Sequence, residues 1–162
     1  MRREFKISKG ASDVFADLKQ YLPRLDIAVG PFNLTPHPQE DIERIREAAD
    51  HPIVQALIAL AKKQNRSPAY HPNPRCLIAI EIEFSGSPKL VMGDFTNAST
   101  MGLVGVVISP SHNVEVSRRV NGVSEYIKKL RGLGKVPDGL FANVACVTSD
   151  EFLKLPFGDG YK

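Results

Sequence analysis

The spacing of apolar and polar residues predicts helices and strands in alternation along this chain. Apolar side chains at helical spacing predict helices over residues 11–22, 38–49, 52–64, 93–101 and 112–131, with a terminal helix or turn at 150–155. Short, β-branched apolar runs predict strands over residues 25–29, 76–84, 103–108 and 140–147. Because strands alternate with helices, we expect an α/β fold with a mainly parallel or mixed central sheet flanked by helices on both faces.

The run from Cys76 to Phe84 is the strand that shapes the functional interpretation. Side chains alternate between the two faces of a strand, so the odd-numbered residues, beginning with Leu77, lie on one face. The even-numbered residues, beginning with Cys76, lie on the other. The even face is apolar throughout, whereas the odd face ends in Glu81 and Glu83. Neighbouring buried carboxylates repel each other and lose hydration, so they need a compensating cation. A metal ion is the commonest such cation, and a buried arginine or lysine is the next.

A third acid points to the same end of the predicted sheet. Asp26 interrupts the short apolar strand at residues 25–29. Ligands of α/β proteins bind at the carboxyl ends of parallel strands, where Glu81 and Glu83 are expected. Hard divalent cations prefer carboxylate oxygens, which favours one or two Mg²⁺ or Mn²⁺ ions at Asp26, Glu81 and Glu83. For Glu81 and Glu83 the alternative is a strand end at the surface, with both acids solvated or paired with Arg24 or Arg75. For Asp26 the alternative is a partly exposed strand acid.

Length and composition indicate one ordinary globular domain. The 162 residues fit a single α/β domain, in which residues 33–75 form a helical insertion followed by a proline-rich loop. Hydrophobic residues make up 43% and charged residues 24%, which is typical of globular proteins in water. The net charge of +3 permits nucleic-acid binding without requiring it. Two cysteines in apolar runs and the absence of a long apolar stretch lead us to expect a cytoplasmic protein with no membrane partner.

The segment 11–110 resembles the PD-(D/E)xK, or restriction-endonuclease-like, nuclease superfamily. Residues 25–29 (Leu-Asp-Ile-Ala-Val) resemble its Asp-bearing strand, with Leu25 in place of proline, and residues 80–83 (Ile-Glu-Ile-Glu) resemble its Glu-x-Lys strand. The helix at 93–101 and the strand at 103–108 match the elements that follow. Glu83 occupies the position of the motif lysine, and this Glu-x-Glu variant with Ser85 and Ser87 after it resembles a subset of restriction-like proteins.

The resemblance implies a restriction-endonuclease-like core and metal-assisted hydrolysis of phosphodiester bonds in nucleic acid, with DNA the expected partner. Asp26 and Glu81 would hold Mg²⁺ or Mn²⁺, and Glu83 would be a further ligand or a base. Lys89 would replace the motif lysine by stabilising developing charge or orienting the water. Four basic residues of the helix at 112–131 are candidates for contacts with the nucleic-acid backbone: Arg118, Arg119, Lys128 and Lys129.

Other interpretations remain open. The chain could be a catalytically inactive module of the same fold that binds nucleic acid or a protein partner, including a second copy of itself. It could also be an unrelated α/β protein, such as a small-molecule binder or regulatory subunit. His71 and Asn73 in the proline-rich loop are within possible reach of the acids. The pattern favours Asp94, Asn97 and Ser99 as caps or polar residues on the surface of a helix.

Overall fold

The computed structural model describes residues 24–33, 38–65, 70–137 and 139–156, and the helix predicted at 11–22 lies outside them. Four strands form one sheet in the order β1 (Ile27–Phe32), β2 (Cys76–Ile82), β3 (Gly102–Ser109) and β4 (Val144–Thr148). Strand β1 is antiparallel to β2, whereas β2, β3 and β4 are mutually parallel. The prediction of an α/β fold with a mixed sheet is therefore confirmed.

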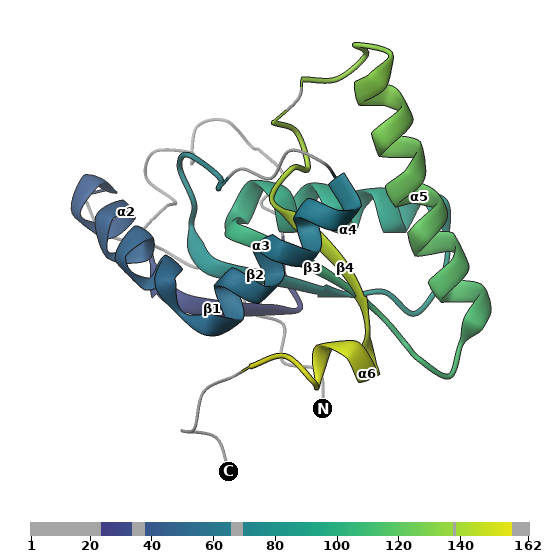
Figure 1. Ribbon diagram of the computed structural model, residues 1–162, viewed down its shortest axis with the longest axis horizontal. Helices are drawn as coiled ribbons and strands as arrows, with labels where there is room; N and C mark the ends of the chain where they lie inside the picture. Colours follow the sequence, from purple (N-terminus) through teal and green to yellow (C-terminus); the bar gives the residue numbers. More distant parts are fainter. Residues whose placement is uncertain (1–23, 34–37, 66–69, 138, 157–162) are drawn as a thin grey trace.

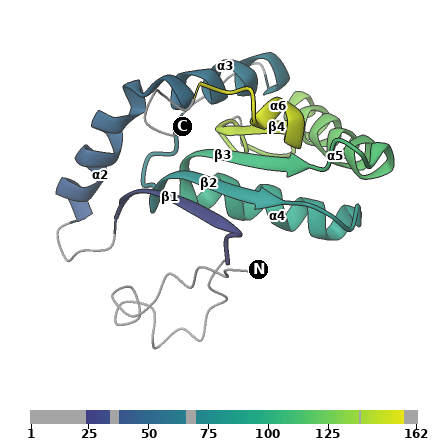
Figure 2. The same cartoon turned by 90° about the horizontal axis from the view of Figure 1, so that it is seen from below.

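The helices form layers on the two faces of this sheet (Figure 1). Their bounds are α2 (Pro38–Glu47), the 3-10 turn η2 (Ala48–Asp50), α3 (Pro52–Asn65), α4 (Pro88–Met101), α5 (Val114–Gly132) and α6 (Ser149–Phe152). Helix α3 packs on one face, with Ile78 and Ile80 of β2 in its core cluster. Figure 2 shows α4 on the opposite side of the sheet from α3. Helix α5 shares the face of α4, since both contribute to the cluster around Val107.

Several predicted boundaries are wrong, among them the end of β1 and the starts of α4 and β4. Strand β1 runs through Gly30–Pro31 as far as Phe32, although its pairing with β2 is irregular between Val29 and Phe32. Helix α4 begins at Pro88, with Ser87 at its N-cap position, because proline is well tolerated in the first helical turn. Strand β4 begins at Val144, four residues later than predicted.

The side chain of Asn143 explains why residues 140–143 form turns instead of a strand. Its amide nitrogen donates to the backbone oxygens of Ser99 and Gly102, at 3.0 and 3.1 Å, and its oxygen accepts from the Ser99 hydroxyl at 2.9 Å. Both Asn143 and Ser99 are buried. These bonds join the approach to β4 to the junction between α4 and β3, and they show that Ser99 is an interior residue, which corrects its predicted place on the helix surface.

The free edge of β4 is covered by a side chain of α3. The Gln64 amide donates to the carbonyl oxygen of Cys146 at 2.7 Å and accepts from its backbone N–H at 2.7 Å. Gln64 therefore substitutes for a neighbouring strand and satisfies two groups that would otherwise be open to pairing with another chain.

In the described part of the chain, no helix is long and apolar enough to cross a membrane. Phe84, which the alternation placed on the apolar face of the second strand, lies beyond the end of β2 and is 67% exposed.

Candidate functional site

Sheet register places Asp26 opposite Glu81 at the carboxyl end of β2. Ile27 pairs with Ile80 in the antiparallel β1–β2 ladder, so the preceding Asp26 faces the following Glu81. On the other side Glu81 pairs with Val107 of β3. Directly opposed residues of an antiparallel pair project to the same face, and like charges in that arrangement destabilise the sheet. Two acids separated by 55 positions in the sequence therefore meet at one point.

Two hydrogen bonds link these acids but leave one carboxylate oxygen of Glu81 without a donor. The backbone N–H of Asp26 donates to Glu81 Oε2 at 3.3 Å, and the backbone N–H of Ile82 donates to Asp26 Oδ2 at 2.8 Å. Glu81 is only 3% exposed, and its Oε1 atom is buried with no hydrogen-bond partner. An unpartnered buried carboxylate oxygen is costly, so this atom is a vacant acceptor directed into the protein.

Burial raises the pKa of Glu81 to about 7, against the opposing effect of the Asn97 amide, and the charge of Asp26 adds to the rise. Burial also raises the pKa of Asp94 to about 8, with further contributions from its hydrogen bond to Glu83 and from the charges of Glu81, Glu83 and Asp26. The four acids therefore influence one another, and at neutral pH the folded chain holds protons among them. Strongly raised carboxyl pKa values of this kind are frequent at functional sites.

Glu83 is held differently, by the turn that follows it. Its Oε1 accepts hydrogen bonds from the Ser85 N–H, from the Ser85 hydroxyl at 2.8 Å and from the Gly86 N–H at 3.0 Å. Burial alone would raise the pKa of Glu83, but hydrogen bonds from Ser85, Asp94 and Gly86 outweigh burial and lower it. Glu83 is thus a fixed, ionised carboxylate. Its 3% exposure, like that of Glu81, excludes solvated carboxylates at the surface for these two residues. Asp26, in contrast, is exposed, which agrees with its alternative interpretation as an exposed strand acid.

Asp94 and Asn97 are the members of this site that the sequence pattern did not assign. They lie in the middle of α4, three residues apart and so on one side of the helix, which packs on β2 and β3. The expected cap at Asp94 is wrong, because α4 begins six residues earlier. A helix started at Pro88 has Val91, Phe95 and Ala98 as its buried stripe, with Asp94 beside it, and that spacing could have identified the residue.

Three other candidates are not brought to the acids. Lys89 is exposed in the first turn of α4, and no hydrogen bond or ion pair between described residues joins it to Asp26, Glu81 or Glu83. The backbone N–H of His71 bonds to the carbonyl of Leu103, at the opposite end of the parallel strands, and the N–H of Asn73 bonds to His71 Nδ1. The possibility that His71 and Asn73 reach the acids is therefore not realised in the structure.

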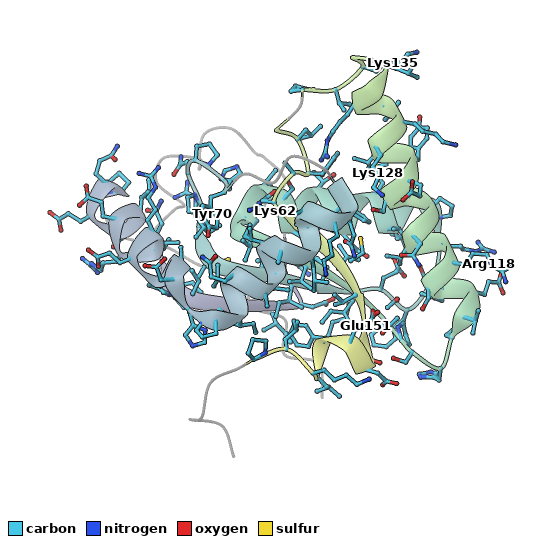
Figure 3. The ribbon with its side chains drawn as sticks, viewed as in Figure 1. Lys62, Tyr70, Arg118, Lys128, Lys135 and Glu151 are labelled. Atoms are coloured by element: carbon cyan, nitrogen blue, oxygen red, sulfur yellow. The ribbon has the colours of Figure 1, made fainter. Side chains whose placement is uncertain are left out.

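The four basic residues of α5 do not share one face of that helix. Arg118 and Lys129 are exposed, whereas the side chain of Lys128 is 27% exposed and paired with Glu125. In the view of Figure 3, Arg118 and Lys128 project to different sides of α5. Arg119 pairs with Glu115 at 2.6 Å. A continuous basic stripe along α5 is thus absent, and Arg118 with Lys129 is the pair most open to a phosphate backbone.

The donor set fits a lightly coordinated hard cation. Among the described residues, no three His, Cys, Asp or Glu side chains are already placed to hold a metal ion together. Mg²⁺ usually takes only one or two protein carboxylates and completes its shell with water and phosphate oxygens. Asp26 and Glu81, in mutual contact and with one vacant oxygen on Glu81, match that requirement.

Comparison with protein-family models, with curated proteins and with solved structures finds no match to this chain.

Proposed function

We propose that the acids at the carboxyl end of β2 bind a divalent cation and that the protein is a Mg²⁺-dependent, nuclease-like hydrolase of phosphodiester bonds. One observation carries this proposal: Glu81 is buried opposite Asp26, and its Oε1 has no partner. The repulsion between the two acids, and the raised pKa of Glu81, are what a bound cation would relieve. A structural role alone gives no reason for burying Glu81 beside a second acid.

The order of elements supports the resemblance to the PD-(D/E)xK superfamily. The strand that begins directly after Asp26 pairs with the Glu-bearing strand, which is followed by α4 and by the parallel strand β3. We propose on this basis that the sheet and its helices form a restriction-endonuclease-like core. The segment between β1 and β2, which contains α2 and α3, would then be an insertion into that core.

In this proposal each acid of the site has a separate role. Asp26 and Glu81 would hold the ion, which when bound polarises the scissile phosphate and lowers the pKa of an attacking water. Glu83 is unsuited to act as a base, because its Oε1 already accepts three hydrogen bonds and its pKa is lowered. It would serve as a fixed anion beside the ion, accepting from a water of the ion's shell, because no three described acids are placed to bind one ion directly. Asp94, protonated at neutral pH, would donate to Glu83 and keep that carboxylate in place.

A second candidate function is a catalytically inactive binding module for nucleic acid or a protein partner. It is favoured by Glu83 in the place of the motif lysine and by the exposed Lys89, which makes no contact with the acids among the described residues. Such a module would keep the cation site and the exposed pair Arg118 and Lys129 but would lack a group to stabilise the transition state.

Incubation of the protein with single- and double-stranded DNA and with RNA distinguishes these functions. We expect cleavage that requires Mg²⁺ or Mn²⁺ and falls at least about 100-fold in Glu81→Gln, because the variant keeps the shape of the side chain and loses its charge. Glu43→Gln, an exposed acid of α2, is the matched control and should cleave normally. Salt-dependent binding without cleavage would establish the inactive module. Cleavage that persists in Glu81→Gln would contradict the proposed site.

A further inference from the structure

The turn after β2 fixes the carboxylate of Glu83 through donors from the next residues. Three hydrogen bonds from Ser85 and Gly86 converge on the single atom Oε1. The Ser85 hydroxyl also accepts from the N–H of Ser87, at 3.1 Å, which closes the turn on itself. The direction of the Glu83 carboxylate, and with it the position of its other oxygen, is therefore set by the conformation of residues 85–87.

Helix α5 holds that turn from outside. Arg119 Nη1 donates to the carbonyl oxygen of Gly86 at 3.2 Å, and Nη2 pairs with Glu115 Oε1, one helical turn earlier, at 2.6 Å. The planar guanidinium thus bridges a residue of its own helix and the residue whose N–H binds Glu83. A lysine has a single nitrogen and cannot reproduce this two-point geometry.

Gly86 lets the turn and the helix approach each other. Its φ of +65° is in the left-handed region that favours glycine. A Cβ at this position would lie 3.2 Å from Cδ of Arg119 and 3.3 Å from Cγ2 of Val116. Both the conformation and the close packing therefore depend on the absence of a side chain at residue 86.

We propose that Arg119 is a positioning residue for the cation site, acting through Gly86 on Glu83, and that it is not a contact to the nucleic-acid backbone. The inference rests on the proposed function, because it assumes that the acids bind a cation. It separates Arg119 from its neighbour Arg118, which is exposed and has the charge to contact phosphate without a hydrogen bond to the turn at Gly86 among the described residues. Groups that orient metal ligands from outside typically change metal affinity about 10- to 100-fold when removed.

Calorimetric titration with Mn²⁺ tests this assignment with Arg118→Ala as the matched control. We expect Arg119→Ala to weaken Mn²⁺ affinity about 10-fold and Arg118→Ala to change it less than about 2-fold. Arg119→Lys should recover part of the loss, and Gly86→Ala should reproduce it by displacing the turn. Far-ultraviolet circular dichroism and thermal unfolding show that each variant is folded.

Nucleic-acid affinity measured at several salt concentrations tests whether Arg119 contacts phosphate instead. If Arg119 contacts phosphate, its removal lowers the salt dependence of binding by about one counterion and leaves Mn²⁺ affinity unchanged, which overturns the inference. Equal losses of Mn²⁺ affinity in Arg118→Ala and Arg119→Ala also overturn it. A wild-type protein that binds no Mn²⁺ contradicts the proposed function itself. Mn²⁺ binding that is normal in Arg119→Ala contradicts only the role assigned to Arg119.

Discussion

Glu81→Gln is expected to stabilise the protein by roughly 2 kcal/mol at about pH 8.5 when divalent cations are removed. Glutamine keeps the shape of the side chain, cannot ionise, and can donate from its amide to the Asp26 carboxylate. The wild-type chain must instead bury a charge beside a second acid, with the Glu81 Oε1 atom unpartnered. Denaturant unfolding in EDTA measures the difference, and Glu43→Gln on the exposed side of α2 should stay within about 0.5 kcal/mol of wild type.

The same groups give the wild-type stability a defined pH dependence. The folded pKa values of Glu81, about 7, and Asp94, about 8, lie above the ordinary values of 4.5 and 3.8. The folded state therefore binds more protons than the unfolded state between these limits, so the stabilisation is complete below about pH 4 and is lost as the pH rises through 7 and 8. We expect the free energy of unfolding in EDTA to fall by about 2–4 kcal/mol from about pH 5 to about pH 8.5.

Two results would oppose this expectation. A stability that is flat or increases across the same range would mean that Glu81 and Asp94 are ionised at neutral pH without penalty. A Glu81→Gln variant that is less stable than wild type at high pH would mean that the charged carboxylate is compensated within the chain, which removes the physical reason for a cation.

Gly105→Ala is expected to destabilise the fold by about 2–3 kcal/mol. A Cβ at Gly105 would lie 2.6 Å from the carbonyl oxygen of Ala98 and 2.8 Å from its carbonyl carbon. These are backbone atoms of α4, so the clash cannot be relieved by rotating a side chain, and the helix must move away from β3. Thermal and denaturant unfolding measure the loss.

Gly93→Ala is the matched control for this substitution. Gly93 lies on α4, the helix that a Cβ at Gly105 would meet, and a Cβ at Gly93 itself would meet nothing within 4 Å. Alanine has the higher helix propensity, so this variant should be more stable than wild type by about 0.5–1 kcal/mol. A Gly105→Ala variant that unfolds at the wild-type denaturant concentration would contradict the direct packing of α4 on β3, and with it the placement of Asp94 over the sheet.

The interior strands and the long helices could be predicted from the sequence because their apolar patterns are strong and local. The run at residues 103–108 is apolar throughout, as β3 requires when both of its faces are covered. Alternation at residues 76–82 correctly assigned Ile78 and Ile80 to the face opposite Glu81. Asp26 and Glu81 could be proposed as partners because each is an acid within an apolar strand.

The missed features depend on contacts between distant parts of the chain. Asp94 was taken for a cap because Asp, Asn and Ser are good caps, whereas Pro88 provides the true start of α4. The late start of β4 reflects the bonds of Asn143 to Ser99 and Gly102, which lie more than 40 positions away. The role of Gly86 and Arg119 in holding Glu83 likewise requires the fold, because no spacing pattern links residues 86 and 119.

Crystals grown with Mn²⁺ test the central claim most directly through anomalous scattering, which locates the ion independently of any activity. The account predicts a peak at the carboxyl end of β2, within about 2.2 Å of carboxylate oxygens of Asp26 and Glu81, that disappears in Glu81→Gln. A map without a peak at these two residues, or one whose peak there persists in Glu81→Gln, would contradict it.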